Sequence, residues 1–289
     1  MAVTVTNAHI KTFEANVRFL AQQQVTRLRP FVTEVNRQSE SHNWDRLSPA
    51  TAAQKTSAAQ ATPNSLGGAW TRRMDTVSTW NTGDSVEPED IVQMLIDPNS
   101  AIARSEAMAM KRTVDSLIIA AATGNSVDGA GSTAALPAGQ IIGTGSEKFS
   151  FDMVTAVTEK FLNNNIDPTE PKCFAIGPNQ MRKLLQLSEA TSDDYVNAKA
   201  LANTGYVSNW MGYDWVVSTL LTQPTPGTDI RIFAFTRWAL GLHVAKDVWT
   251  RVAEDPSISF AWRIYSALTM GAMRVEDEHL VECYISNTL

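Results

Sequence analysis

The residues that could carry out chemistry are few in this chain, and they form no recognisable active-site pattern. The sequence contains no G-x-S-x-G nucleophile elbow, no H-E-x-x-H zinc motif and no G-x-x-x-x-G-K-[ST] phosphate loop. The closest stretches are a glycine loop, Gly143-Thr144-Gly145-Ser146, and an acidic stretch, Glu276-Asp277-Glu278-His279. No convincing strand precedes the glycine loop. Alternate residues of a strand point to opposite faces, so the acidic stretch is expected to be a solvated turn rather than a metal site.

The remaining candidate groups also lack partners. Cys173 and Cys283 are far apart in sequence and have neither C-x-x-C nor metal-type spacing, which fits a reducing compartment and predicts buried thiols. Asp193-Asp194 is more typical of a helix start than of an acid pair. The four histidines have no recurring carboxylate or cysteine beside them: His9, His42, His243 and His279. We therefore predict no catalytic residue, no cofactor and no metal.

Composition narrows the classes of function further. The 289 residues carry a formal net charge of -6, with 44% hydrophobic and 19% charged residues. This length suffices for one large or two modest cores. The net negative charge argues against binding nucleic acid through a basic surface that releases counterions. No apolar run reaches the roughly 18 residues of a membrane span, and no signal peptide is visible, so we expect a soluble, cytoplasmic origin.

The element around which the rest is organised is a long helix predicted over Asp97 to Gly124. Asp97 or Ser100 can cap its first amides, Pro98 suits its opening turn, and Gly124 can take a left-handed exit. Small and apolar residues recur at helical spacing along one face, and charged ones occupy another sector. The apolar face consists of Ala103, Ala107, Met110, Val114, Ile118 and Ala121, and the charged sector of Arg104, Lys111 and Asp115.

Ahead of this helix lies a segment that has too few apolar residues to fold by itself. Residues 39–69 are mostly Ser, Thr, Ala, Gln, Asn, Pro and Gly, and strand-like alternation flanks them at Phe31–Val35 and Met74–Trp80. The pattern predicts a long protruding hairpin, with disorder as the alternative. Trp44, Trp70 and Trp80 lie in or beside it, and large aromatics on a polar excursion indicate anchoring to a partner.

The other predicted elements follow in order along the chain. Helices are expected at Asn7–Arg29, Val86–Ile96, Phe151–Leu162 with Ser150 as its cap, after Gly177-Pro178, and from Thr191 to Gly205. Strands are expected at Lys172–Ile176, Trp210–Thr219 with a kink at Gly212, Ile230–Phe235, Leu240–Val244, Val248–Val252, Ile258–Val275 with a bend at Gly271, and His279–Ile285. The result is an α+β chain with a Gly-rich break at 124–148, an α/β block and a β-rich end.

Several short motifs, taken together with their order along the chain, indicate a resemblance to a known family. They are Ala21–Pro30 (AQQQVTRLRP), Arg72–Met74 (RRM), Met94–Ala101 (MLIDPNSA), Asp115–Gly124 (DSLIIAAATG), Gly212–Trp215 (GYDW), Ala261–Ser266 (AWRIYS) and Met270–Glu276 (MGAMRVE). Together with the order of the elements, they resemble the major capsid proteins of tailed bacteriophages with the Hong Kong 97-type fold. The resemblance covers nearly the whole chain.

The resemblance implies a division of the chain. Residues 1–30 would form an N-terminal arm or helix, and 31–85 an extended β-hairpin loop whose central part, about 39–70, reaches over a neighbouring subunit. Residues 86–148 and 227–289 would form a peripheral domain with a spine helix at 99–123 and a long-stranded sheet. Residues 149–226 would form an α/β axial domain. Candidates for contacts between subunits are Trp44, Arg46, Trp70, Arg72, Arg73 and Trp80.

The resemblance also implies a function without catalysis. The chain would assemble as pentamers and hexamers into an icosahedral shell around double-stranded DNA, in the host bacterial cytoplasm and then in the virion. It would hold the DNA without sequence-specific binding. The chain ahead of the loop is short, so a separate scaffolding protein is expected, with a portal and a possible decoration protein. Two alternatives stay open: an encapsulin-like bacterial nanocompartment, and an α/β enzyme with an unmarked active site.

Overall fold

The computed structural model describes residues 22–49, 68–87, 98–187 and 206–288 of the chain. The helices are α2 (Pro98–Thr123), α3 (Phe151–Asn163) and α4 (Pro178–Leu184), with 3-10 turns η1 (Arg29–Phe31), η2 (Ala138–Gln140) and η3 (Pro256–Ile258). The strands are β1 (Thr33–Asn36), β2 (Ser41–Leu47), β3 (Trp70–Thr76), β4 (Ser78–Val86), β5 (Ser126–Val127), β6 (Thr133–Ala134), β7 (Ile141–Ile142), β8 (Lys172–Ile176), β9 (Asn209–Trp210), β10 (Tyr213–Val217), β11 (Asp229–Thr236), β12 (Leu240–Asp255), β13 (Ala261–Arg274) and β14 (Leu280–Ser286). This mixture confirms the predicted α+β class.

The chain divides into two compact units. One consists of Met1–Val25, Thr79–Arg112 and Val248–Leu268, and the other of Thr26–Ser78, Thr113–Asp247 and Thr269–Leu289. Helix α2 and the strands β12 and β13 continue from one unit into the other.

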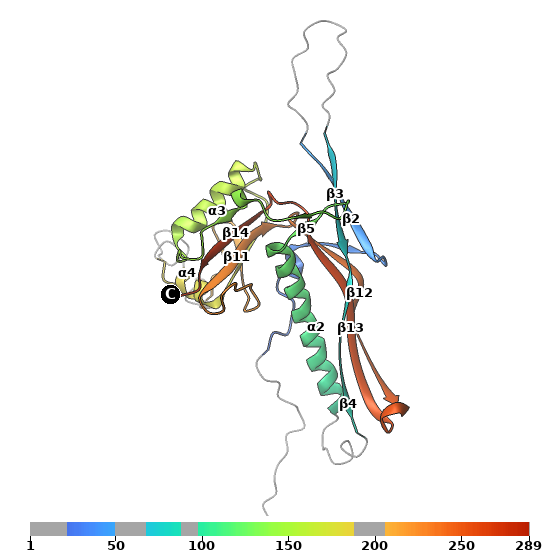
Figure 1. Cartoon of the computed structure of the whole chain (residues 1–289). Helices are drawn as coiled ribbons and strands as arrows, with labels where there is room; N and C mark the ends of the chain where they lie inside the picture. The colour runs from blue at the N-terminus through green and yellow to red at the C-terminus, as the bar shows by residue number, and fades with distance from the viewer. Residues whose placement is uncertain (1–21, 50–67, 88–97, 188–205, 289) are drawn as a thin grey trace, which may run out of the picture. The chain divides into compact units, whose positions relative to one another are not determined.

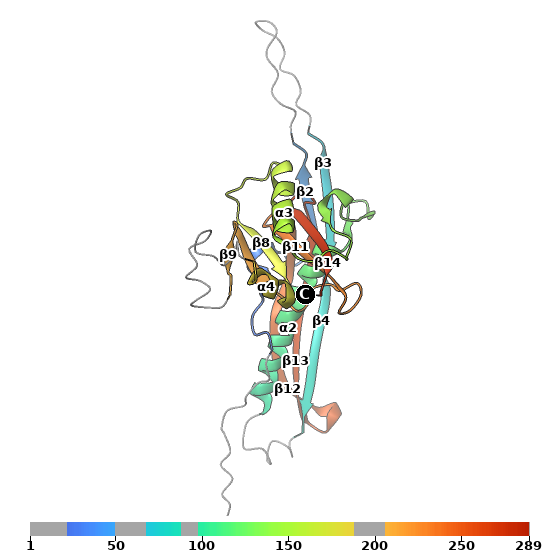
Figure 2. The same ribbon diagram turned by 90° about the vertical axis from the view of Figure 1, so that its left-hand side faces the viewer.

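The larger unit contains a six-stranded sheet in the order β7-β14-β11-β8-β10-β9. Strand β8 is buried along its whole length, and Phe174 at its centre stacks on Trp215 with ring centroids 4.7 Å apart. Helix α3 begins as predicted, because the Ser150 hydroxyl accepts a hydrogen bond from the Met153 amide at 3.4 Å. Helices α3 and α4 lie on the same side of this sheet (Figures 1 and 2).

The sheet corrects the predicted assignment of the C-terminal strands. We expected residues 227–289 to return to a sheet separate from that of 149–226. Instead, β11 pairs with β8 and β14 pairs with β11, so both complete the six-stranded sheet. The predicted kink at Gly212 is a tight turn: Met211 and Gly212 both have positive φ and connect the antiparallel strands β9 and β10.

A second sheet has four strands in the order β1-β12-β13-β4. The two strands predicted at 240–244 and 248–252 are one continuous strand, β12, and β13 is the long strand that alternation predicted. Strand β1 pairs in parallel with Gly241–Val244. The stretch around Phe31–Val35 therefore belongs to this sheet and is not an arm of the hairpin, and β4 joins the same sheet.

The long helix is confirmed as α2, which Figure 1 shows as the longest of the described helices. Met110, Val114 and Ile118 of its predicted apolar face are buried. Asp115 was placed in the charged sector, but it is 1% exposed. Its carboxylate accepts hydrogen bonds from the backbone amides of Arg27 and Leu28, at 2.9 and 3.2 Å.

This contact accounts for one error in the prediction. The N-terminal helix was expected to continue to Arg29, but residues 22–28 are not helical. The backbone amides of Arg27 and Leu28 donate to Asp115 instead of continuing a helical ladder, and Pro30 lies within the short turn η1. The rest of that predicted helix, most of the one at Val86–Ile96 and the one at 191–205 lie outside the described residues. Val86 itself ends β4.

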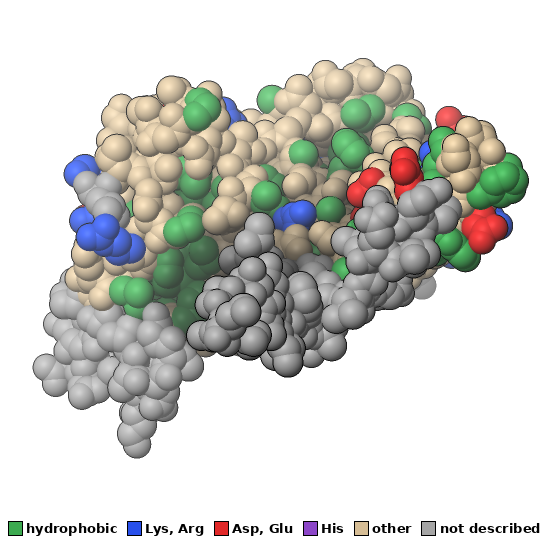
Figure 3. All heavy atoms as spheres, turned by 90° about the horizontal axis from the view of Figure 1, so that it is seen from below, with side chains coloured by type: hydrophobic (Ala, Val, Ile, Leu, Met, Phe, Trp, Pro, Cys, Tyr) green, Lys and Arg blue, Asp and Glu red, His purple; other side chains and the backbone are tan. Residues whose placement is uncertain are grey.

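In the smaller unit, the far ends of β12 and β13 form a hairpin beside the first part of α2. The Ser266 hydroxyl donates to the Glu106 carboxylate at 2.8 Å, and the rings of Trp249 and Tyr265 lie 5.5 Å apart. The tip exposes Val252, Ile258 and Phe260. Figure 3 shows hydrophobic and acidic side chains together at this end, on the right of the view. Within the described residues, no helix is long and apolar enough to span a membrane.

Gly271 does not bend β13 as predicted, because the strand continues through it to Arg274. A Cβ atom at this position would lie 2.8 Å from the Thr76 carbonyl oxygen and 3.2 Å from the Asp75 carboxylate. The glycine therefore permits a close approach of two chain segments.

We expect Gly271→Ala to lower the free energy of unfolding by about 1–3 kcal/mol, because the added methyl group overpacks this contact. Gly139→Ala is the matched control, since nothing lies within 4 Å of its Cβ position and its φ is not positive. Urea unfolding of the full-length chain measures both. Equal stability of the two variants would show that the close approach is not a constraint.

Candidate functional site

The predicted contact residues gather on and around the hairpin of β2 and β3. The two strands pair antiparallel, with Ser41 opposite Thr76 and Leu47 opposite Trp70. The hairpin arms are therefore Ser41–Leu47 and Trp70–Thr76, both inside the span that the sequence predicted to be the loop. The segment between them, 50–67, lies outside the described residues.

Because side chains alternate across a strand, the hairpin has two chemically different faces. The inner face carries the pairs His42–Asp75, Trp44–Arg73 and Arg46–Thr71, and the outer face carries Asn43–Met74, Asp45–Arg72 and Leu47–Trp70. Arg73 and Asp75 are buried, whereas the residues of β2 that face outward are exposed. We use the terms inner face and outer face for these two sets below.

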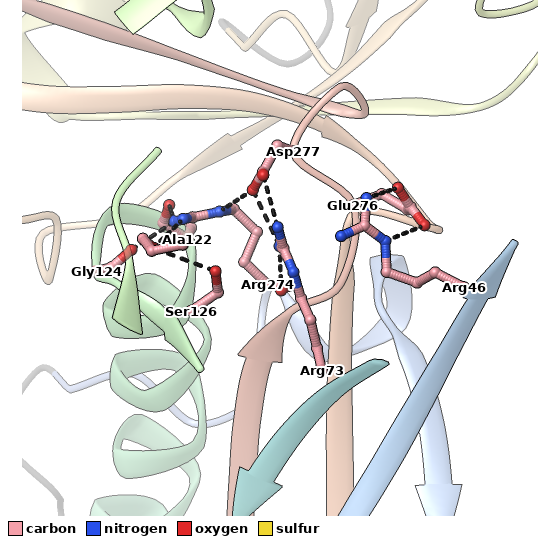
Figure 4. A network of polar contacts seen from close by, with 9 residues as sticks. Arg46, Arg73, Ala122, Gly124, Ser126, Arg274, Glu276 and Asp277 are labelled. Carbon is pink, nitrogen blue, oxygen red and sulfur yellow. Dashed lines mark hydrogen bonds and ion pairs between the residues drawn. The ribbon is translucent and has the colours of Figure 1, made fainter. Parts of the chain in front are cut away.

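Two arginines fix the inner face to the same chain (Figure 4). Arg73 makes two parallel hydrogen bonds to the Asp277 carboxylate, at 3.0 and 2.6 Å, and a third to the Arg274 carbonyl at 2.8 Å. Arg46 makes a second two-point pair with Glu276, at 2.8 and 2.9 Å. Two-point pairing of this kind is geometrically specific as well as strong. The hairpin base is thereby oriented by the segment that follows β13.

Arg274 connects this network to the end of α2. Its guanidinium donates to Asp277 at 2.7 Å, to the Ala134 carbonyl at 3.1 Å and to the Gly124 carbonyl at the helix end. The side chain is fully buried. Terminal helix carbonyls lack partners within the helix and carry partial negative charge, so a buried cation here stabilises the end of α2.

The electrostatics of Asp277 follow from these contacts. Burial opposes ionisation of the carboxyl and is the largest single influence on it. The hydrogen bonds from Arg73 and Arg274 together outweigh burial and lower the pKa of Asp277. The carboxylate is thus charged at neutral pH and holds two buried guanidinium groups at once.

The aromatic part of the inner face also packs on its own chain. The ring of Trp44 lies over Gly241 of β12, where a Cβ atom would come within 2.5 Å of the indole. His42 meets the Trp44 ring edge-on, with centroids 4.8 Å apart. Trp44, Arg46 and Arg73 were predicted as contacts between subunits, and the structure engages all three within one subunit.

The outer face is exposed to solvent, whereas most of the inner face packs on its own chain. Leu47 and Trp70 lie directly opposite each other and are 56% and 73% exposed. Next to them, Arg72 and Asp45 form an exposed ion pair at 2.6 Å. Trp80, the remaining candidate, is 44% exposed on β4. The structure thus leaves Trp70, Arg72 and Trp80 accessible among the six predicted residues.

The stretches that were considered for chemistry have structural explanations. The glycine loop is occupied by its own chain, because the Glu147 carboxylate accepts the Thr144 amide at 2.7 Å, and this bond lowers the pKa of Glu147. Cys173 and Cys283 are buried free thiols. Among the described residues, no group of three His, Cys, Asp or Glu side chains could hold a metal ion.

A cavity of about 400 Å³ at the hairpin base is lined by Arg46, Arg72 and Arg73, among others. Each of these arginines pairs with a carboxylate of the same chain: Glu276, Asp45 or Asp277. The arginine charges that line the cavity are thus already paired, and these pairs hold elements of the chain together.

Sequence reasoning missed the importance of Arg274, Glu276 and Asp277. The acidic stretch was interpreted as a solvated turn, but Asp277 is half-buried by two arginines. The available signal was an Arg-Val-Glu-Asp sequence at the end of a long strand, next to an arginine pair at 72–73. Only the fold shows that these segments meet.

The architecture defines a class of protein. Solved phage capsids share this fold over nearly the whole length of the chain. The capsid of Ralstonia phage GP4 matches with a TM-score of 0.74 and 8% identity, covering 100% of this chain and 98% of that one. The capsid of cyanophage P-SCSP1u matches at 0.73 and 17% identity (97% and 94% covered), and the mature capsid of bacteriophage PhiM1 at 0.69 and 15% (97% and 93%). The fold is the Hong Kong 97-type capsid fold.

The sequence agrees with the fold. Residues 5–286 match the model of the phage capsid protein family, so the chain belongs to this family. It is a major capsid protein, a structural component of the virion. A search among curated proteins finds no match. Neither the nanocompartment nor the enzyme alternative receives support from these comparisons.

Asp277→Ala should destabilise the chain by about 3 kcal/mol, because it leaves two buried guanidinium groups without their shared carboxylate. Asp45→Ala is the matched control: it removes the acid of the exposed pair with Arg72 and should cost less than about 1 kcal/mol. Urea unfolding of full-length protein measures both free energies. Similar losses for the two variants would contradict the proposed anchoring.

Proposed function

We propose that the outer face of the β2–β3 hairpin binds a second copy of this chain, and that repetition of this contact builds the capsid shell. The observation that carries the proposal is the difference between the two faces. The inner face is tied down by Arg46 and Arg73, while Leu47 and Trp70 remain exposed at the far end of the described strands. A rigidly held arm with an unpaired aromatic end is suited to reach another subunit.

The chemistry of the outer face supports a protein partner. Tryptophan is enriched among interface residues that cost about 2 kcal/mol or more when truncated, and such residues function best inside a ring of weaker polar contacts. The Asp45–Arg72 pair beside Trp70 supplies polar groups of that kind.

A contact between two different surfaces of identical subunits closes into a ring when the rotation permits. On this basis the proposal extends to pentamers and hexamers of an icosahedral shell that encloses double-stranded DNA. The net charge of -6 fits a wall that confines DNA without binding it tightly. The proposed partners are a scaffolding protein and a portal, with a possible decoration protein, and the proposed place of assembly is the cytoplasm of the host bacterium.

Trp70→Ala should leave the subunit folded and reduce shell formation strongly, because it removes the aromatic anchor without touching the inner face. Thr71→Ala is the control, since Thr71 is exposed on the same strand but belongs to the opposite face. Trp70→Phe should restore part of the assembly. Electron microscopy and sedimentation of protein produced with its scaffolding protein report the shells. Normal shells from Trp70→Ala would refute the anchoring role.

Shortening the hairpin tests the arm as a whole. Replacing residues 49–68 by Asn-Gly would join Ser48 to Ala69, whose backbone groups already bond at 3.0 Å, in a two-residue turn. This cut keeps Trp44, Arg46 and Arg73, so the subunit should unfold at the same urea concentration as the wild type. It should nevertheless fail to close shells. Closed particles of normal size from the shortened chain would show that the arm is dispensable.

A further inference from the structure

Two ionisable side chains are buried against each other where the hairpin meets β12. Asp75 on β3 and His243 on β12 are 1% and 0% exposed, and the Asp75 Oδ2 and His243 Nδ1 atoms lie 3.5 Å apart. The other carboxylate oxygen of Asp75 accepts the His42 amide at 3.0 Å. Neither Oδ2 of Asp75 nor Nδ1 of His243 has a conventional hydrogen-bond partner.

The hydrogen bonds of His243 determine where a proton must lie. Its Nε2 atom is 2.9 Å from the Arg37 carbonyl oxygen, which can only accept, so Nε2 carries a hydrogen. In the neutral ring, Nδ1 then has a lone pair, and Oδ2 of Asp75 lies 3.5 Å from it. Two buried acceptor atoms this close to each other repel, and a proton bound between Nδ1 and Oδ2 replaces the repulsion by a hydrogen bond. This holds whether the proton is on the imidazole or on the carboxyl group.

Among the described residues, one further titratable side chain, His42, faces the pair, and its charge also lowers the pKa of Asp75. On β2, His42 faces the site with its ring 5.5 Å from that of His243, and the Trp44 Nε1 atom is buried without a partner. The link before β2 contributes the Arg37 carbonyl and the Ser39 hydroxyl. On β13 the neighbour is Gly271, and on β3 the charge of Arg73 is held by Asp277.

We propose that Asp75 and His243 share one bound proton, and that this proton locks the inner face of the hairpin onto β12. The orientation of the arm is then coupled to pH. The inference rests on the proposed function for its consequence, since the lock controls how firmly the outer face is presented to a second copy. The lock itself can be tested on the unassembled chain.

The sign of the coupling follows from proton counting. When the hairpin is released, an exposed carboxyl titrates near pH 3.9 and an exposed imidazole near pH 6.5, so at pH 8 the two groups hold no proton. In the docked state burial raises the pKa of Asp75, and the charge on His243 only partly opposes this. Above about pH 6.5 the docked state therefore binds one proton more than the released state. Its advantage is largest in mild acid, between the two reference values, where both states hold one proton, and is lost as the pH rises through the raised value.

Hydrogen exchange of the full-length, unassembled chain tests the lock. Protection of the β2 and β3 amides, corrected for the intrinsic exchange rate, should fall between pH 6 and pH 9 by up to about tenfold per pH unit. Asp75→Asn should make protection independent of pH, because the amide can donate to Nδ1 of neutral His243. Asp45→Asn on the outer face and His42→Gln beside the pair should keep the wild-type profile.

If Asp75→Asn does not fold, His243→Gln takes its place, because it keeps a donor near the Arg37 carbonyl and cannot titrate. A pH-independent wild type, or an Asp75→Asn variant with the wild-type profile, would overturn the proposal. The two hypotheses are separable. Shells that form normally from a chain without this pH dependence would refute the lock alone. A chain that shows the lock but whose Trp70→Ala variant assembles normally would refute the proposed function alone.

Discussion

The shared carboxylate of Asp277 is the contact on which the functional arrangement depends. It receives Arg73 from the hairpin and Arg274 from the end of β13, and Arg274 also donates to the carbonyl of Gly124, directly after α2. Three elements that are distant in sequence are thereby held at one point. Removing the partner of a buried guanidinium group is strongly destabilising, so movements that separate Asp277 from Arg73 or Arg274 are unfavourable. The position of the arm follows from that rigidity.

A rigid base and a free outer face together explain how a polar segment can be useful in a capsid protein. Residues 39–69 contain too few apolar side chains to bury by themselves, and the structure compensates by attaching only one side of the hairpin. Trp44 occupies the space above Gly241, and Arg73 and Asp75 are buried, so most of the inner face is engaged within the chain. Leu47 and Trp70 on the other side are exposed. In the proposed function, ion pairs align the arm and this apolar pair provides the binding surface.

Local signals predicted α2, α3 and β8 well, because capping residues and periodicity act within a few residues. The register of the hairpin could not be predicted, since it depends on pairing across the polar segment. Trp44 and Trp70 look alike in sequence, yet they face opposite sides because one pairs with Arg73 and the other with Leu47. Asp277 and Arg73 are 204 positions apart, and Asp115 captures backbone amides 87 and 88 positions away. Contacts at such separations leave no local pattern, which is why the acidic turn and the charged side of α2 were misjudged.

A cryo-electron microscopy map of shells assembled from this chain would show both faces of the hairpin at once. We expect Arg73 to pair with Asp277 of its own subunit, and Trp70 and Leu47 of the same hairpin to lie against a different subunit. A map in which Trp70 packs on its own subunit, or in which Arg73 pairs with a carboxylate of another subunit, would contradict this expectation.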